Sequence, residues 1–376
     1  MPAKTVNRQE PAPVAMTTQK IRDQIPSHYF KQNHWKSTGY LLRDLAQTAV
    51  TVAVMWYAVL PVVAAAASVN SLVGGVAAFV AWNLYAFVQG LNWTGIWVLA
   101  HECGHRAFSP SVAVNDAFGI VLHSALLVPY HSWRISHGNH HKHTNHLEKD
   151  TVFVPETVDK KQLAVREAVS ESPIASVGWI VVMLTLGWPG YLLANMAGQK
   201  YEKRANHFEP TSPLFRIGER PDVVKSDIGL IVMLAALGFA VAEFGAANVA
   251  LWYGMPYLWV NAWLVFITYL QHSDVRIPHY TPDNWNFVRG ALSTVDRDFG
   301  TAINWWLHHI NDSHVVHHLF STMPFYNAIE VTRKHIKPIV GEYYVSDARP
   351  LRTSLLESWT NCRVVAPHEG VMYFKQ

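Results

Sequence analysis

Charged residues are scarce in this chain. Of its 376 residues, 15% are Asp, Glu, Lys or Arg and 50% are hydrophobic, whereas a typical soluble domain is about 25% charged. The shortfall excludes a disordered or coiled-coil protein, because both are rich in charge. It also disfavours a purely water-soluble enzyme. A net charge of +3, with no block of Lys and Arg, gives no indication of a nucleic-acid partner.

Cysteine is nearly missing as well. The two cysteines, Cys103 and Cys362, are too few for a disulfide framework, which favours a reducing compartment or a cytosolic face. The polar N-terminus lacks an apolar core followed by a small-residue cleavage site, so we expect no signal peptide. We find no internal repeat and no low-complexity linker, and we therefore expect one integrated domain.

Long apolar runs account for the missing charge. Residues 45–100 contain no Asp, Glu, Lys, Arg or His over 56 positions. A membrane-spanning helix needs about 20 apolar residues, so this run predicts two spans, at about 45–68 and 72–100. Ser68, Asn70, Ser71 and the Gly74-Gly75 pair mark the expected turn between them.

A second apolar run covers residues 228–273 and contains one acid and one histidine. It breaks at Gly-Met-Pro in residues 254–256, where we expect another turn. The run therefore predicts two further spans, at about 228–252 and 256–272.

Two shorter apolar stretches complete the pattern. Residues 117–133 are too short for a span and contain His123, Pro129 and His131, which favours an interfacial or re-entrant segment. Residues 172–199 are long enough to span, but Gly187, Pro189 and Gly190 interrupt them, so we expect them to lie in the interface as well. A reading with six spans remains open.

Charge in the loops sets the expected orientation. The first 44 residues hold seven Lys and Arg against three acids, and residues 200–225 hold six against four. Basic loops favour the cytoplasmic side. The expected fold is an all-α integral membrane protein with four transmembrane helices in two hairpins, interfacial helices and a cytosolic, His-rich cap. Residues 1–44 would be a polar cytosolic segment, 45–345 the membrane domain and 346–376 a cytosolic tail.

Histidine is the residue in excess. Sixteen of the 21 histidines fall in residues 101–146 and 272–318, each window beginning where an apolar run ends. His101 and His105 stand at i and i+4, so a helix directs both rings the same way. Two more groups have the spacing i, i+3, i+4, and Asp312 or Ser313 is placed to cap the helix of the later one. These groups are His137, His140 and His141, and then His314, His317 and His318.

Imidazole nitrogen is a ligand for Fe, Zn, Cu and Ni. Eight rings at ligand spacing exceed what one tetrahedral zinc ion uses, so two metal ions fit better than one. His101-Glu-Cys-Gly-His105 also matches the H-E-x-x-H signature of zinc peptidases, although a peptidase has no use for the later boxes. A metal transporter is a third alternative, but transporters hold ionisable residues inside their spans. Histidines with no joint role are the fourth.

The three histidine groups resemble the boxes of the membrane-bound fatty acid desaturases, specifically the microsomal delta-12 (omega-6) type. That family shows H-[DE]-C-G-H, H-x-x-H-H and H-V-x-H-H. The flanking residues 129–137, 148–155 and 318–328 are also similar to the family, and the resemblance covers roughly residues 90–345. Phe325 departs from it, because the family often has His there.

The resemblance implies a di-iron site that uses O2 and two electrons to insert a double bond into an acyl chain. It implies a ninth ligand at the cytoplasmic end of the last span, where this chain has His272. His308 is also histidine in the family pattern and is expected to surround the ligands rather than join them. The implied ligands are His101, His105, His137, His140, His141, His272, His314, His317 and His318.

Metal-bound rings usually donate their other N–H to a carboxylate or carbonyl. The acids placed near the boxes are candidates for that role: Glu102, Asp116, Glu148, Asp150, Asp296 and Asp298. An apolar substrate tail must also thread between the spans. Aromatic residues of the second span are candidates to line its path: Trp82, Tyr85, Trp93 and Trp97.

The electrons must come from another protein. The chain has no His-Pro-Gly-Gly haem motif and no flavin or nicotinamide fingerprint. Its basic loops suit an acidic donor such as cytochrome b5 with its reductase. No Ser/Arg-rich transit segment is present, so we expect a multi-pass protein of the endoplasmic reticulum membrane with its active site facing the cytosol.

The resemblance favours conversion of oleoyl to linoleoyl chains, with a new cis double bond at delta-12, in an acyl lipid of the bilayer. Omega-3 desaturation, hydroxylation and acetylenic bond formation share the scaffold and remain open. Ala107, Ser321 and Met323 look like the ordinary desaturase rather than these relatives.

Overall fold

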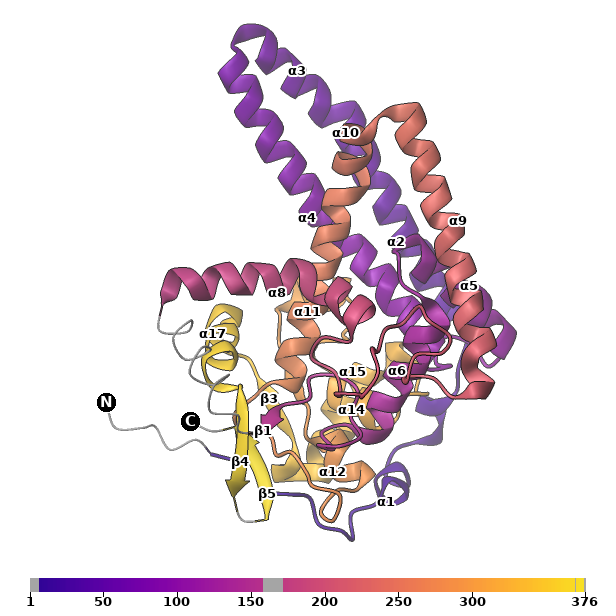
Figure 1. Cartoon of the computed structure of the whole chain (residues 1–376), viewed down its shortest axis with the longest axis vertical. Helices are drawn as coiled ribbons and strands as arrows, with labels where there is room; N and C mark the ends of the chain where they lie inside the picture. The colour runs from indigo at the N-terminus through magenta and orange to yellow at the C-terminus, as the bar shows by residue number, and fades with distance from the viewer. Residues whose placement is uncertain (1–6, 158–171, 369, 375–376) are drawn as a thin grey trace.

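The computed structural model describes residues 7–157, 172–368 and 370–374. Long helices extend to one end of the molecule, and short helices and strands gather at the other (Figure 1). Five helical segments are long and apolar enough to cross a membrane, by length and composition, or six if one bent pair is counted. The protein is therefore a multi-pass membrane protein with a cap. The five segments are His34–Val69, Ser71–Gly104, Pro173–Ala194, Ile217–Phe244 and Ala246–His272.

The first hairpin has its turn where the sequence predicts it. Helix α2 (His34–Val54), a π-helical turn (Met55–Val59) and α3 (Leu60–Val69) lead to Asn70, and α4 (Ser71–Gly104) returns. The Asn70 side chain caps α4, because it accepts hydrogen bonds from the backbone N–H groups of Leu72 and Val73. The helix begins at His34 rather than near residue 45, because Asn33 caps it there. Residues 34–44 thus continue the first membrane helix.

The second hairpin corrects the predicted spans at 228–252 and 256–272. Helix α9 (Arg220–Phe244) ends at Gly245, whose φ of +81° makes the turn, and α10 (Ala246–Val249) begins directly after it. The expected break at residues 254–256 lies inside a continuous helix, where a π-helical turn (Ala250–Gly254) runs into α11 (Met255–His272). Pro256 cannot donate a backbone hydrogen bond, and the wider π-helical turn before it accommodates its ring, so the helix continues through this residue.

Two further segments lie near the junction between long helices and cap. Helices α5 (Val112–Ala125) and α6 (Tyr130–His143) are bent by 106° at their break, so residues 117–133 do not form one helix. Helix α8 (Pro173–Ala194) runs across the direction of α9 and α11 (Figure 1). Pro189 lies inside α8 without interrupting it.

The cap adds strands, so the expectation of an all-α fold is incomplete. Strand β1 (Glu156–Thr157) pairs in parallel with β4 (Val364–His368), which pairs in antiparallel with β5 (Val371–Phe374). Strand β2 (Val295–Arg297) pairs in parallel with β3 (Val345–Asp347). The expected C-terminal tail is therefore packed structure, because these short β-branched segments find partners far away in sequence. The remaining α-helices among the described residues are α1 (Thr18–Arg22), α12 (Phe287–Leu292), α13 (Thr301–Trp306), α14 (His314–Leu319), α15 (Phe325–Val331), α16 (Lys337–Val340) and α17 (Leu351–Asn361).

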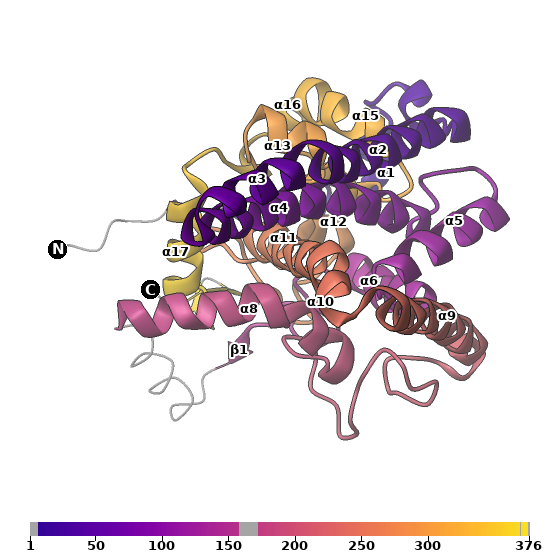
Figure 2. The same ribbon diagram turned by 90° about the horizontal axis from the view of Figure 1, so that it is seen from above.

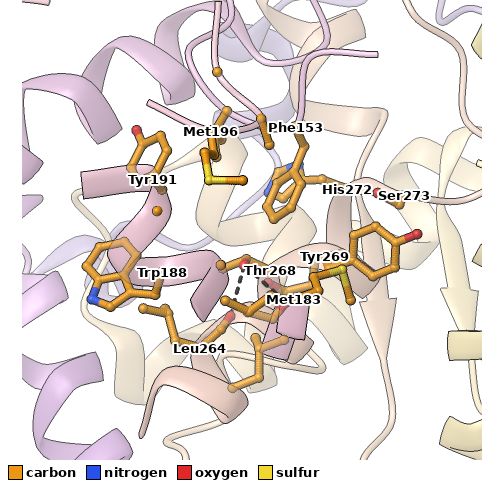
Figure 3. Close-up of a pocket in the computed structure, with 18 of the residues that line it drawn as sticks. Phe153, Met183, Trp188, Tyr191, Met196, Leu264, Thr268, Tyr269, His272 and Ser273 are labelled. Carbon is orange, nitrogen blue, oxygen red and sulfur yellow. Dashed lines mark hydrogen bonds between the residues drawn. The ribbon is translucent and has the colours of Figure 1, made fainter. Parts of the chain in front are cut away.

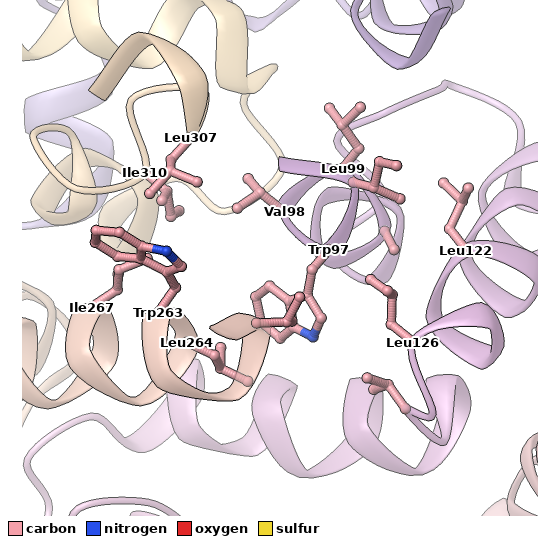
Figure 4. Close-up of a cluster of buried hydrophobic side chains, with 14 of the residues drawn as sticks. Trp97, Val98, Leu99, Leu122, Leu126, Trp263, Leu264, Ile267, Leu307 and Ile310 are labelled. Carbon is pink, nitrogen blue, oxygen red and sulfur yellow. The ribbon is translucent and has the colours of Figure 1, made fainter. Parts of the chain in front are cut away.

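The main core lies where α4 and α11 enter the cap. Trp97 of α4, Leu122 of α5 and Leu264 of α11 belong to one buried cluster (Figure 4). Seen from above, α4 and α11 lie side by side near the middle of the molecule (Figure 2). Their close approach requires Gly90, since a Cβ there would lie 2.3 Å from the Cβ of Trp259. This packing fixes the positions at which both helices end.

Candidate metal centre

Four helices bring their histidines to one place. His101 lies in the last turn of α4, His105 caps that helix, and His272 is the last residue of α11. The other two histidine groups lie on α6 and α14. All nine rings predicted as ligands are thus contributed by helix ends or short helices at the face of the cap towards the membrane helices.

The short helices are held by residues outside them. Ser226 of α9 caps α6, because its hydroxyl accepts hydrogen bonds from the N–H groups of His131 (2.9 Å) and Ser132 (3.2 Å). Asp296 of β2 accepts the N–H of Val315 (2.8 Å) and thereby caps α14. The expected cap by Asp312 or Ser313 is wrong, since neither side chain accepts a hydrogen bond at this helix start. The start of α14 is therefore capped by a tertiary contact from Asp296 and not by a residue next to the helix.

Two groups of ring nitrogens have the spacing of metal sites. In each group the ligand atoms all lie within 4.8 Å of one another. His101 Nε2 lies 2.9 Å from His317 Nε2 in the first, and His140 Nε2 lies 3.3 Å from His272 Nε2 in the second. The first group is His101, His105, His137 and His317, and the second is His140, His272 and His318.

The other two histidines join the groups. His314 Nε2 lies 3.0 Å from His272 Nε2, and His141 Nε2 lies 3.1 Å from His137 Nε2. The His141 ring also stacks on His318 at 4.0 Å. All nine predicted rings therefore form one continuous cluster with two centres.

Burial determines the charge state of this cluster. Burial, and then the neighbouring imidazoles, hold the pKa of His314 and His318 well below the ordinary value. The same causes lower the pKa of His317 to about 3. These rings are therefore neutral at physiological pH, which is the form that binds metal.

The donor set fits metal ions. Ring nitrogens such as His105 Nε2 and His318 Nε2 are buried and have no hydrogen-bond partner among the described residues. An unpaired buried nitrogen is costly, and so many neutral rings packed together satisfy one another poorly. Metal ions within the two groups would satisfy these nitrogens.

Two predicted carboxylates contact the cluster. Asp150 is 4% exposed, and its Oδ1 accepts a hydrogen bond of 2.6 Å from His140 Nδ1. This bond directs Nε2 of His140 towards the second group. Glu102 is 1% exposed and places its Oε1 3.6 Å from His317 Nδ1 and 3.7 Å from His101 Nε2. Among the described residues, no hydrogen-bond donor reaches either oxygen of Glu102.

Four of the predicted surrounding residues lie away from the cluster. Asp116 pairs with Arg106 at 2.7 Å, and Glu148 is exposed. Asp298 accepts from the Gly300 N–H and from Asn304. His308 donates to Asp44 of α2 at 2.7 Å. Position next to a box in sequence does not place a side chain at the cluster, because Asp116, Asp298 and His308 point to other partners and Glu148 lies at the surface.

Sequence reasoning missed two supporting residues. The hydroxyl of Thr144 lies 3.0 Å from His318 Nδ1 and so links α6 to α14. The Trp133 ring stacks on His137 at 4.4 Å. Helical spacing offered a signal for both, because each is four residues from a box histidine on α6.

A cavity of about 1200 Å³ opens beside the histidines (Figure 3). Its mainly apolar wall comes from α4, α8 and α11 together with the segments that follow α6 and α8. His140, His272 and His314 line it. Its size and apolar wall suit a long hydrocarbon chain.

Most residues predicted to line the substrate path or to set the reaction outcome do not line this cavity. Among the four aromatic residues proposed for the path, Trp97 lines it, whereas Trp82 and Tyr85 pack around Trp252 and Trp93 contacts Tyr253. Ala107, Ser321 and Met323 are also absent from its wall. The span that carries these aromatic residues reaches far beyond the cavity, so most of its side chains face other helices.

Comparison with known proteins agrees with this geometry. The family model described as fatty acid desaturase matches residues 77–349. The chain is 42% identical to a delta(12) fatty acid desaturase of Mortierella isabellina, with 96% of this chain and 90% of that protein covered. This chain belongs to the fatty acid desaturase family. The desaturase is also 43% identical to a delta(12)-acyl-lipid desaturase of Punica granatum, with 98% and 91% covered. An oleate hydroxylase of Claviceps purpurea is 42% identical, with 89% and 73% covered.

Family membership decides among the alternatives that the histidines left open. The desaturase is an oxidoreductase, and the zinc-peptidase and transporter interpretations no longer apply. The family model includes all nine histidines of the cluster within residues 77–349.

Proposed function

We propose that this desaturase introduces a cis double bond at delta-12 of oleoyl chains in an acyl lipid, giving linoleoyl chains. The observation that carries the proposal is the apolar cavity whose wall includes His140, His272 and His314. The position of the new bond follows from the relatives, which are named as delta(12) desaturases and are 42–43% identical over most of the chain.

We further propose that the nine histidines hold two iron ions. The first four-membered group would hold one ion and the second group the other, with His141 and His314 adjacent to them. A bound di-iron centre supplies the O2-derived oxidant that unactivated C–H bonds require. In the balanced reaction, two hydrogens leave the acyl chain and, with two electrons and two protons, reduce O2 to two waters.

The protein's own residues hold the chain and exclude water. Three tryptophans line the cavity, and Trp97 contacts the other two, with ring centroids 5.2 Å from Trp133 and 6.1 Å from Trp188. They give the chain an apolar surface beside the histidines, which favours hydrocarbon over water. Asp150 keeps His140 oriented through its 2.6 Å hydrogen bond.

The membrane arrangement remains a proposal. Four spans in two hairpins, with α8 in the interface, agree with the crosswise direction of α8 (Figure 1). The cap and its histidines would face the cytosol at the endoplasmic reticulum, where cytochrome b5 and its reductase would supply electrons. Tags at residue 10 and in the 200–225 loop should then both be cytosolic, and a lumenal 200–225 loop would contradict the four-span arrangement.

Hydroxylation of oleate is the second candidate. The identity to the Claviceps purpurea oleate hydroxylase, 42% over 358 residues, is as high as that to the Mortierella isabellina desaturase. The same centre and cavity would serve both reactions, since the products differ in the fate of the chain after its first hydrogen is removed.

Expression in a yeast that makes oleate but no linoleate separates these candidates. Gas chromatography of the fatty acids should show linoleate, which requires both the delta-12 position and desaturation. Ricinoleate would favour the hydroxylase. Conversion only of added linoleate to its omega-3 product, or an acetylenic acid, would reject the delta-12 proposal for the corresponding relative.

A further inference from the structure

Phe153 has a backbone conformation that aromatic residues rarely adopt. Its φ is +49°, in the left-handed region, where a side chain with a Cβ is disfavoured and bulky residues are outliers. Such conformations persist where the surrounding structure imposes them, and they cluster at functional sites.

Both flanks of Phe153 are fixed by hydrogen bonds. On the N-terminal side, Oδ1 of Asp150 accepts the N–H of Thr151 (2.7 Å) and of Val152 (3.3 Å). The same oxygen accepts from His140, so this flank is tied to the histidine cluster. On the C-terminal side, the N–H of Val154 donates to the carbonyl of Ala197 (3.0 Å). Phe153 lies between these two hydrogen-bonded segments, and its left-handed backbone makes the turn that connects them.

The turn places the Phe153 ring over His272. The two rings are nearly parallel, at 13°, with centroids 6.0 Å apart, and the Tyr269 ring is also 6.0 Å away. Phe153 and Met196 form adjacent parts of the cavity wall (Figure 3). The ring therefore stands where the apolar cavity meets the histidine cluster.

We propose that Phe153 is a specificity-determining residue that holds the acyl chain against the histidine cluster and so fixes which methylenes react. This inference rests on the proposed function. A flat ring in one fixed orientation narrows the cavity beside His272. An acyl chain that passes this ring therefore has one insertion depth, which determines the carbons that lie beside the histidine rings. Without the Phe153 ring, the chain can slide, and neighbouring carbons reach the same position.

The test compares two glycine substitutions in the oleate-producing yeast. Phe153→Gly removes the ring and the disfavoured conformation together. Leu127→Gly is the matched control, because Leu127 also has a positive φ (+56°) but lies in the turn between α5 and α6, away from the cavity wall. Phe153→Leu keeps an apolar side chain of smaller volume. Fatty-acid products are analysed for double-bond position, and purified proteins for iron content and thermal midpoint.

We expect both glycine variants to fold and to retain iron, because relief of a left-handed residue offsets part of the packing that is lost with each half-buried side chain. Phe153→Gly should then raise the share of positional isomers and of shorter acyl substrates several-fold, with Phe153→Leu between it and wild type. Leu127→Gly should leave product positions unchanged.

The outcomes separate this inference from the proposed function. If the wild-type protein makes no linoleate, the proposed function fails. If it makes linoleate while Phe153→Gly yields less product with unchanged bond positions and substrate preference, the role of Phe153 is structural and the inference is overturned. If Phe153→Gly loses iron or fails to fold, Phe153→Leu decides, and unchanged positions in that variant overturn the inference as well.

Discussion

Asp150 offers the sharpest test of how this desaturase organises its histidines. Its carboxylate is 4% exposed and accepts four hydrogen bonds, one from a histidine ring and three from the backbone. Asp150→Asn keeps the shape but removes the charge and replaces one acceptor oxygen by an N–H2 group. Because both oxygens accept N–H donors, either orientation of the amide makes at least one donor face another donor.

The expected magnitude follows from those contacts. Hydrogen bonds to charged groups contribute about 1.5–3 kcal/mol each, and loss of a partner that orients a metal-binding ring lowers metal affinity by roughly 10- to 100-fold. We therefore expect Asp150→Asn to bind iron about 10- to 100-fold more weakly, since His140 is no longer held in one tautomer and orientation. The second histidine group should lose iron before the first.

Iron retention against a graded chelator measures this effect on purified protein. Asp298→Asn is the control, because Asp298 also accepts two hydrogen bonds, from Gly300 and Asn304, but outside the cluster. It should retain iron like the wild type. Equal iron retention by Asp150→Asn and the wild type would refute the reasoning that Asp150 orients a ligand.

Three further predictions follow from described contacts. His140→Ala and His317→Ala each remove a ring from one of the two histidine groups, so each should abolish desaturation while the protein stays in the membrane, and whole-protein iron analysis should show a lower iron content than in the wild type. Gly90→Ala should destabilise the protein by about 1–3 kcal/mol, because the new Cβ would lie 2.3 Å from Trp259; an unchanged thermal midpoint would contradict the close approach of α4 and α11. Burial alone would raise the pKa of Asp347, but hydrogen bonds from Arg349 and Ser354 and the charge of Arg297 outweigh it and hold that pKa below its ordinary value. A carboxyl group with a depressed pKa stabilises the fold at pH values above its unfolded pKa of about 3.9, and this stabilisation is lost as the pH falls towards the folded pKa. Asp347→Asn removes this contribution, so the variant should lose less thermal stability than the wild type when the pH is lowered from neutral to acid.

The sequence predicts the chemistry of the centre better than its surroundings. Helical spacing places the rings of each box on one side, and this local rule holds for α4, α6 and α14 alike. The acids are harder to predict, because Asp150 and Asp298 both lie in segments next to a box, yet only Asp150 contacts a ring. Whether a carboxylate turns towards a ring or towards a nearby backbone N–H depends on tertiary packing.

The spans show the same limit. A turn at Asn70 follows from local polar residues, and the structure confirms it. The turn at Gly245 was missed because Pro256, a strong local signal for a break, lies after a π-helical turn that accommodates it. The strands of the cap were missed because each is short and pairs with a partner distant in the chain, as Glu156 does with Val364.

The hydrogen bond between Asp44 and His308 has a consequence for biosynthesis. Asp44 lies on the first membrane helix and is 1% exposed, and its histidine partner follows 264 residues later. Gln9 is similar, because its side-chain amide donates hydrogen bonds to the carbonyls of Leu292 and Tyr343, which follow 283 and 334 residues later. During synthesis the ribosome releases the first helix long before His308 exists, so at that stage the Asp44 carboxylate has its neighbour Arg43 as a partner but not the histidine ring. The N-terminal part of the protein therefore cannot reach its final position until translation is nearly complete, and nascent chains that stop before residue 308 should expose this helix to the quality-control machinery of the membrane.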